Sequence, residues 1–206
     1  MKKKIIIGSR GSKLALLYAE KAKQSIIENN EELNEDSFEI KIIKTEGDIN
    51  QTQRLSEIGG KGLFSKTIEK ELLNKNIDIA VHALKDLPSL ETEGLVAGVY
   101  LKRNDPREAL ISKDKKNILE LEKNSIVGTS SFRREAQLKN LRNDLITKLI
   151  RGNVDTRIKK LEENKYQAII LALAGVKMLQ KEEKISQIFS VNEILPSVGQ
   201  GIISIQ

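Results

Sequence analysis

The segment Ile5-Ile6-Ile7-Gly8-Ser9-Arg10-Gly11-Ser12 decides the fold class of this 206-residue chain. Its three isoleucines predict a buried strand, and apolar residues recur at helical spacing from Ser12 to about Ile27. The small residues between strand and helix allow a tight turn. A second copy of this pattern begins at Ile126-Val127, continues through Gly128-Thr129-Ser130-Ser131-Phe132-Arg133-Arg134, and enters a predicted helix over 133–141. Repeated passage from strand to helix is typical of α/β folds.

The rest of the chain follows the same alternation. Apolar runs predict further strands at 38–43, 77–81, 95–101, 145–150 and 168–173, and helical spacing predicts helices at 63–73 and 154–161. Such an order indicates mainly parallel sheets that are covered by helices on both faces.

Two polar stretches divide the chain. Lys102-Arg103-Asn104-Asp105-Pro106-Arg107 lies near the midpoint, and Leu195-Pro196-Ser197-Val198-Gly199-Gln200-Gly201 lies near the end. Proline and glycine in such stretches interrupt regular structure, so we interpret both as crossings between two lobes. The predicted lobes are residues 1–101 with 197–206, and residues 102–196.

Composition excludes several classes of protein. Hydrophobic residues make up 39% and charged residues 31%, which is typical of a globular chain. The sequence has no cysteine and a single histidine, His82, so we expect neither disulfides nor a Cys- or His-based metal site. No apolar run approaches the roughly 20 residues of a membrane helix, and the short run after Met1 does not resemble a signal peptide, so we expect a cytoplasmic protein without membrane contact. Neither a P-loop nor a Gly-x-Gly-x-x-Gly motif is present.

Arginines gather after predicted strands in a chain that otherwise prefers lysine. The formal charge is +6, with 26 lysines and nine arginines. Arg10 follows the first strand, and four arginines follow strands of the second lobe: Arg133, Arg134, Arg151 and Arg157. Arginine binds carboxylate or phosphate through two parallel hydrogen bonds, which lysine cannot do. A capped helix with exposed basic residues would explain either Gly/Ser-rich segment alone, but two such segments favour paired anion sites.

His82-Ala83-Leu84-Lys85-Asp86 directly follows the strand predicted at 77–81. Ligands of open α/β sheets bind beyond the carboxyl ends of strands, so Lys85 and Asp86 are candidate site residues. A neighbouring lysine and aspartate are often only a surface pair. Among arginines, however, Asp86 could stabilise a developing cation or move a proton. We interpret His82 as a packed, hydrogen-bonded residue rather than a catalyst.

Seven motifs together resemble the porphobilinogen deaminase (hydroxymethylbilane synthase) family, in the order expected and over nearly the whole chain. They are GSRGSKLAL (8–16), GGKGLF (59–64), HALKDLP (82–88), RNDPR (103–107), GTSSFRR (128–134), RGNVDTR (151–157) and LPSVGQG (195–201). The resemblance implies two periplasmic-binding-protein-like lobes with a cleft between them.

The resemblance also implies a function. Enzymes of this family are transferases of tetrapyrrole (haem) biosynthesis that join four porphobilinogen molecules into hydroxymethylbilane, releasing ammonia, on a dipyrromethane cofactor. By resemblance, Asp86 is the catalytic carboxylate. The acetate and propionate groups of cofactor and substrate would be bound by Arg10, Ser12, Lys85, Thr129, Ser130, Arg133, Arg134, Arg151 and Arg157. The partners implied are porphobilinogen and the growing polypyrrole chain, without nucleic acid, and we expect a monomer. Residues 50–62 resemble the mobile loop of the family.

Two departures from the family accompany these motifs. Family members continue into a third domain whose cysteine holds the cofactor, whereas this sequence ends at Gln206 and has no attachment cysteine. We therefore expect the C-terminal primer-attachment domain to be missing. Met178 also stands where the family usually has an arginine. The alternative to a competent enzyme is an inactive remnant that binds anions or pyrroles.

Overall fold

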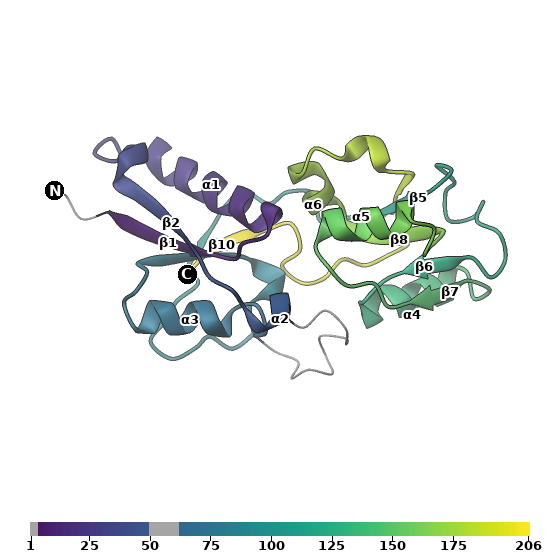
Figure 1. Ribbon diagram of the computed structural model, residues 1–206, viewed down its shortest axis with the longest axis horizontal. Coiled ribbons are helices and arrows are strands. Elements are labelled where there is room, and N and C mark those ends of the chain that lie inside the picture. Colours follow the sequence, from purple (N-terminus) through teal and green to yellow (C-terminus); the bar gives the residue numbers. More distant parts are fainter. Residues whose placement is uncertain (1–3, 50–61) are drawn as a thin grey trace. The chain divides into compact units, whose positions relative to one another are not determined.

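The chain forms two compact units in the computed structural model, which describes residues 4–49 and 62–206 (Figure 1). Of the described residues, unit 1 comprises 4–49, 62–103 and 202–206, and unit 2 comprises 104–201. The chain thus crosses between units after Arg103 and after Gly201. These crossings lie two and five residues later than the boundaries predicted from the sequence, so residues 197–201 fall in unit 2 rather than in lobe 1.

Unit 1 contains one five-stranded sheet in the order β2-β1-β3-β10-β4. The strands β2, β1 and β3 are parallel, and β10 pairs antiparallel with both β3 and β4. The elements of the unit are β1 (Ile5–Ser9), α1 (Lys13–Glu28), η1 (Glu35–Ser37), β2 (Phe38–Ile42), α2 (Glu46–Ile49), α3 (Lys66–Leu73), β3 (Ile79–Ala83), η2 (Leu84–Asp86), β4 (Val99–Tyr100) and β10 (Ile203–Ile205).

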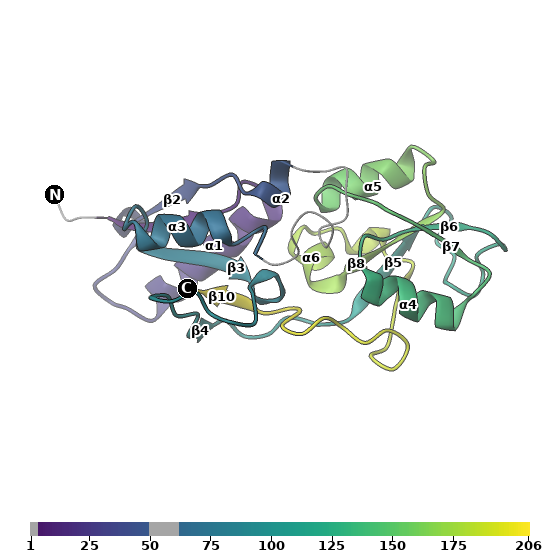
Figure 2. The same cartoon turned by 90° about the horizontal axis from the view of Figure 1, so that it is seen from below.

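Helices cover both faces of this sheet, α1 on one side and α3 on the other (Figures 1 and 2). Ile68 of α3 packs with Ile43, Ile77 and Ala80, all of which are buried. Successive residues of a strand point to opposite faces, so His82, two residues after Ala80, points to the α3 side as well. Apolar burial on two faces explains why β1 and β3 read as nearly continuous hydrophobic runs.

Unit 2 contains a second five-stranded sheet with the same pattern of directions, in the order β7-β6-β8-β5-β9. Its strands β7, β6 and β8 are parallel, and β5 pairs antiparallel with both β8 and β9. The elements are β5 (Glu108–Ser112), β6 (Ile126–Gly128), α4 (Phe132–Leu141), β7 (Ile146–Lys148), α5 (Val154–Glu162), β8 (Ala168–Ala172), α6 (Leu173–Met178), η3 (Glu182–Lys184) and β9 (Gln187–Ile188).

Two apolar clusters fill the two faces of the second sheet. Leu138 of α4 packs with Leu110 and Ile170 on one face, and Ile158 of α5 packs with Ile111 and other residues on the opposite face. The side-chain alternation of β5 therefore supplies one core with Leu110 and the other with Ile111.

The predicted fold class, two α/β lobes with mainly parallel sheets, is confirmed. The strand predicted at 95–101 is shorter than expected, since only Val99–Tyr100 pairs. The antiparallel strands β5 and β10 were not predicted. Every residue of β5 is buried, so its sequence lacks the alternation of polar and apolar residues that marks a half-exposed strand.

No helix in the described part of the chain is long and apolar enough to cross a membrane. The loop predicted at 50–62 lies, except for Gly62, outside the described residues.

Candidate functional site

Unit 1 carries its candidate residues at one edge of its sheet. Arg10 directly follows β1, and Lys85 and Asp86 lie in η2, directly after β3. Because β1 and β3 are adjacent and parallel, their carboxyl ends share this edge. Ser12 forms the N-cap of α1 at the same edge, where its hydroxyl accepts a hydrogen bond from the backbone N–H of Ala15 at 3.3 Å.

Arg10 has an internal carboxylate partner that the sequence did not reveal. Its Nε lies 3.2 Å from each carboxylate oxygen of Asp48, and its Nη2 donates to Oδ1 of the same residue. The guanidinium also lies 3.9 Å above the centre of the Phe64 ring, a cation–π arrangement. Burial raises the pKa of Asp48, but the Arg10 guanidinium and bonds from Thr45 outweigh it, so the pKa lies below its ordinary value. Both contacts fix the direction of Arg10.

Asp86 is half-buried and makes no hydrogen bond or ion pair with residues 4–49 or 62–206. Its charge nevertheless acts on two neighbours. Burial and the charge of Asp86 together raise the pKa of Tyr18 to about 12, so Tyr18 keeps its proton at neutral pH. The same charge opposes the effect of burial on His82. Among the described residues, these charge effects are the interactions that the structure records for the Asp86 carboxylate.

His82 is 6% exposed, as expected for a packed residue, but its Nε2 has no hydrogen-bond partner in the described part of the chain. Burial lowers the pKa of His82 below its ordinary value, although Glu69 and Gln206 act in the opposite direction. The side chain of Gln206 donates to Glu69 at 3.2 Å. His82 is therefore a buried imidazole that is neutral at neutral pH.

Unit 2 carries its candidate residues after β6 and around the start of α4. Ser131 is the N-cap of α4, and its hydroxyl accepts from the N–H of Arg134 at 3.4 Å. Thr129 is only 1% exposed, and its hydroxyl accepts from the N–H of Ser131 at 3.2 Å. Ser130 is half-buried. The Thr129 hydroxyl thus shapes the turn, and Ser130 is the more accessible of the two predicted hydroxyls.

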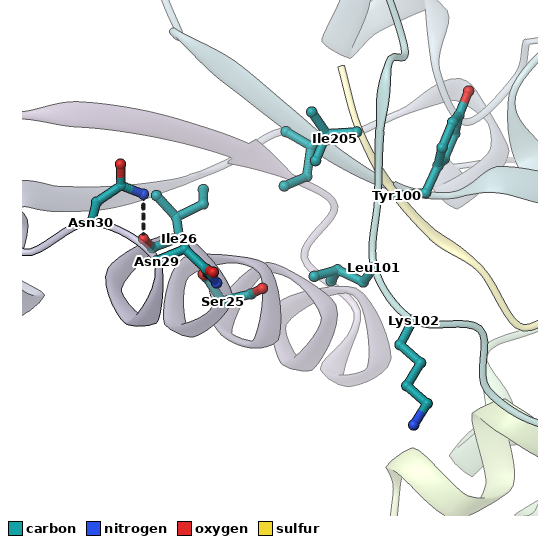
Figure 3. Close-up of a pocket in the computed structure, with 9 residues that line it drawn as sticks. Ser25, Ile26, Asn29, Asn30, Tyr100, Leu101, Lys102 and Ile205 are labelled. Atoms are coloured by element: carbon teal, nitrogen blue, oxygen red, sulfur yellow. Dashed lines mark hydrogen bonds between the residues drawn. The ribbon is translucent and has the colours of Figure 1, made fainter.

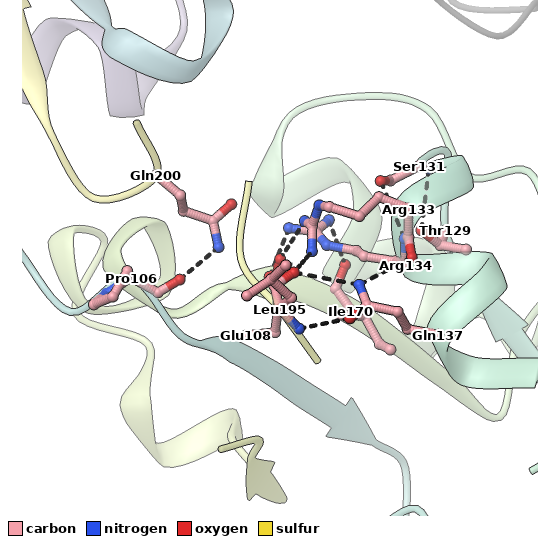
Figure 4. Close-up of polar contacts among 10 residues, drawn as sticks. All are labelled: Pro106, Glu108, Thr129, Ser131, Arg133, Arg134, Gln137, Ile170, Leu195 and Gln200. Carbon is pink, nitrogen blue, oxygen red and sulfur yellow. Dashed lines mark hydrogen bonds and ion pairs between the residues drawn. The ribbon is translucent and has the colours of Figure 1, made fainter. Parts of the chain in front are cut away.

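Arg133 and Arg134 both bind Glu108, which starts β5 and is wholly buried (Figure 4). Arg133 Nη2 lies 2.5 Å from Oε1, and Arg134 Nη2 lies 2.7 Å from Oε2. Arg134 also donates to the carbonyl oxygen of Ile170 at 3.1 Å, whereas Arg133 donates to that of Leu195. Side-chain exposure is 27% for Arg133 and 8% for Arg134. The two arginines, predicted as equivalent, differ in access.

Arg151 and Arg157 flank the turn between β7 and α5. Arg151 is 5% exposed, and Arg157, within the first turn of α5, donates from Nε to the carbonyl oxygen of Gly152 at 2.7 Å. Since β7 is adjacent and parallel to β6, this turn lies at the same sheet edge as the start of α4.

A separate hollow of about 340 Å³ lies in unit 1, beside the end of α1 and the strand β4 (Figure 3). Ile26, Asn30, Tyr100 and Lys102 are among the residues that line it. None of the predicted site residues does, and no cluster of His, Cys, Asp or Glu among the described residues could hold a metal ion.

Each unit thus gathers its predicted residues at one sheet edge, but sequence reasoning missed the internal acids. Asp48 and Glu108 hold three of the predicted arginines. A signal for Glu108 was present, because it is the one charged residue that adjoins the apolar run Ala109-Leu110-Ile111.

The sequence of this chain also matches a known protein family. Residues 5–206 match the family model described as porphobilinogen deaminase, dipyrromethane cofactor binding domain. The chain belongs to the porphobilinogen deaminase family. The resemblance seen in its seven motifs is confirmed, and so is the expected cofactor of the matched domain, dipyrromethane.

Curated relatives of the porphobilinogen deaminase family agree. The chain is 47% identical to porphobilinogen deaminase of Bacillus subtilis (strain 168) over 207 residues, covering 100% of this chain and 65% of that protein. It is 50% identical to the Bacillus pumilus (strain SAFR-032) protein, covering 98% and 64%. The chain therefore spans about 65% of the length of these relatives.

Solved structures show the same fold at low identity. An ABC transporter periplasmic substrate-binding protein from Coxiella burnetii aligns with a TM-score of 0.54 and 12% identity, covering 98% of this chain and 83% of that chain. The ligand-binding component of an ABC-type import system from Staphylococcus aureus aligns at 0.51 and 11%, covering 99% and 66%. The expected periplasmic-binding-protein-like fold is confirmed.

Proposed function

We propose that this porphobilinogen deaminase domain takes part in joining four porphobilinogen molecules into hydroxymethylbilane, with release of ammonia, in tetrapyrrole biosynthesis. Asp86 is the catalytic carboxylate, and cations at the sheet edges of both units bind the acetate and propionate groups of the pyrroles. The single observation that carries the proposal is the family match over residues 5–206, joined to an Asp86 that has no ion-pair partner among the described residues and lies at the edge where Arg10 lies.

The residues present fit a ligand with several carboxylates. Arg133 keeps a partly exposed guanidinium beside the N-terminus of the ten-residue helix α4, and helix N-termini favour anions. Arg10, Ser12, Lys85, Ser130, Arg151 and Arg157 complete the set proposed to hold dipyrromethane. When bound, dipyrromethane supplies the end to which pyrrole units are added. Arg134 and Thr129 act mainly within the protein, since Arg134 donates to Glu108 and to the carbonyl oxygen of Ile170, and the Thr129 hydroxyl accepts from the Ser131 N–H.

Asp86 serves the proposed reaction through its charge. The loss of ammonia from porphobilinogen leaves positive charge on the pyrrole, and an ionised carboxylate within contact distance stabilises such charge. The same carboxylate can accept a proton when the ring is restored. Within residues 4–49 and 62–206 Asp86 forms no ion pair, which supports this role because a carboxylate neutralised by an arginine would stabilise a cation less.

The proposal is tested by incubating the chain with porphobilinogen and added dipyrromethane, followed by oxidation and detection of uroporphyrin-type products. We expect Asp86→Asn to lower the rate of porphobilinogen consumption by about 100-fold or more, the usual range for an acid–base or charge-stabilising group. Asp36→Asn is the matched control, because Asp36 is an exposed acid of unit 1 that precedes β2 at the opposite end of the strands.

Consumption of porphobilinogen at the rate of buffer alone would contradict the enzymatic proposal for this chain. If dipyrromethane still raised the melting temperature, by mass action on the folded state, the chain would instead be the binding-only remnant considered from the sequence. The cytoplasmic location, the monomeric state and the absence of nucleic-acid binding stay predictions.

A further inference from the structure

Glu108 is a buried acid at the centre of the carboxylate-binding edge of unit 2. It is 0% exposed, and each of its two carboxylate oxygens accepts a bond from a different arginine (Figure 4). Both arginines project from the first turn of α4, whereas Glu108 comes from β5. The acid therefore ties the start of the helix to the sheet at the point where ligand carboxylates are expected.

The charges of this cluster do not cancel. Two guanidiniums share one carboxylate, and no second acid lies within ion-pair distance of either arginine in the described ranges. Burial raises the pKa of Glu108, but the Arg134 charge and hydrogen bonds from Arg134, Arg133 and Gln200 lower it below its ordinary value, so Glu108 is ionised at neutral pH. The cluster therefore carries a net charge of +1, and Arg133 is its more exposed cation.

Two hydrogen bonds within the protein fix the Arg133 guanidinium and leave other N–H donors for a ligand. Its Nη2 donates to Glu108 and its Nη1 donates to the carbonyl oxygen of Leu195. A guanidinium has five N–H donors in a rigid plane, so three remain for a ligand. Gln137 keeps Leu195 in position, since Gln137 Oε1 accepts from the Leu195 N–H at 2.6 Å. A fixed guanidinium loses little side-chain entropy when a carboxylate binds.

We propose that Glu108 is the positioning residue of this site: it orients Arg133 and limits the surplus charge to one, which suits a single carboxylate of the pyrrole chain. This inference rests on the proposed function. It predicts that Glu108 contributes to ligand affinity although its own negative charge repels the ligand.

Binding of a dipyrromethane that carries acetate and propionate groups is measured by calorimetry. The chains compared are the wild type, Glu108→Gln, Arg133→Ala and the double variant. We expect Glu108→Gln to weaken binding about tenfold or more, as is usual when a hydrogen-bonded charge pair loses one partner. In the Arg133→Ala background, Glu108→Gln should alter affinity by less than about twofold, because Glu108 acts on the ligand by orienting Arg133.

Several outcomes would overturn the inference. Unchanged or tighter binding by Glu108→Gln would show that Glu108 only neutralises charge, and an equal loss in both backgrounds would show a general structural role. Asp144→Asn is the matched control, since it removes the Arg142–Asp144 pair of unit 2 (2.7 Å) and should leave affinity unchanged.

Two further comparisons keep the test decisive. If Glu108→Gln does not fold, Glu108→Asp takes its place, because it keeps the charge but shortens the reach to Arg133, and the same weakening is expected. Wild-type protein that fails to bind dipyrromethane would overturn the proposed function itself, whereas wild-type binding with unaltered variants would overturn only the inference about Glu108.

Discussion

At the scale of single residues, each unit uses an internal acid to fix an arginine near its sheet edge. An arginine that points toward a sheet edge would be free to turn on its long side chain, and each unit prevents this with an internal acid. Asp48 holds Arg10 in unit 1, and Glu108 holds Arg133 and Arg134 in unit 2. Each acid has a pKa below its ordinary value, so each stays ionised under neutral conditions.

The buried position of Glu108 makes it important for stability as well. Glu108→Gln leaves two guanidiniums without a carboxylate, and we expect the free energy of unfolding at neutral pH to fall by about 3 kcal/mol, near the lower end for a broken buried pair. Urea denaturation followed by circular dichroism measures this change. A loss within error of zero would mean that the pair contributes nothing net to folding.

Lowering the pH should remove from the wild type the same contribution of Glu108 to the free energy of unfolding. The pKa of Glu108 is lower in the folded chain than its ordinary value of 4.5. The stabilisation is therefore fully present above that value and is lost as the pH falls through the folded-state pKa. Denaturation at a series of pH values should show the gap between wild type and Glu108→Gln constant from about pH 7 to pH 5 and shrinking below about pH 4.5. A gap that widened toward acid would contradict the assignment.

At the scale of elements, the sequence predicted what local periodicity encodes. The helices α1, α4 and α5 and the parallel strands follow from apolar spacing and from the turns that join them. The strands β5 and β10 could not be predicted in this way. They form by pairing with β8 and β3, respectively, which lie far away in the chain. The site shows the same limit: a sequence indicates where arginines follow strands, but not whether an acid such as Glu108 already binds them.

Helix α5 allows a direct test of an element that carries candidate residues. Asn153 caps it, with Oδ1 accepting from the N–H of Thr156 at 3.0 Å and from its hydroxyl at 2.7 Å. We expect Asn153→Ala to lower the free energy of unfolding by about 1 kcal/mol, because an N–H of the first turn loses its acceptor. Asn153→Asp retains the acceptor and is the matched control. Equal stability of the alanine variant and the wild type would show that the cap is not needed.

At the scale of the whole molecule, the backbone between residues 62 and 206 crosses from one unit to the other twice, and the residues that flank these two crossings pair with each other. The N–H of Asn104, just after the first crossing, donates to the carbonyl oxygen of Gly201, just before the second, at 2.8 Å. The side chain of Gln200 also donates to the carbonyl oxygen of Pro106 at 2.7 Å. Gln200 further hydrogen-bonds Glu108, so the crossings and the arginines that Glu108 binds share one polar network.

Gly201 is where this arrangement is most sensitive to substitution. Its φ of +86° lies in the left-handed region, and a Cβ there would stand 2.5 Å from the carbonyl oxygen of Asn104. Alanine must therefore adopt an unfavourable backbone conformation and also push the two crossing segments apart, so we expect Gly201→Ala to lower the free energy of unfolding by about 1–3 kcal/mol. Gly98→Ala is the matched control, because a Cβ at Gly98 meets nothing closer than Val96 at 3.4 Å, an ordinary contact. Both variants are compared by thermal and urea denaturation. If they were equally stable, the pairing of the crossings would have no energetic role, and coupling between the crossings and Glu108 would lose its structural basis.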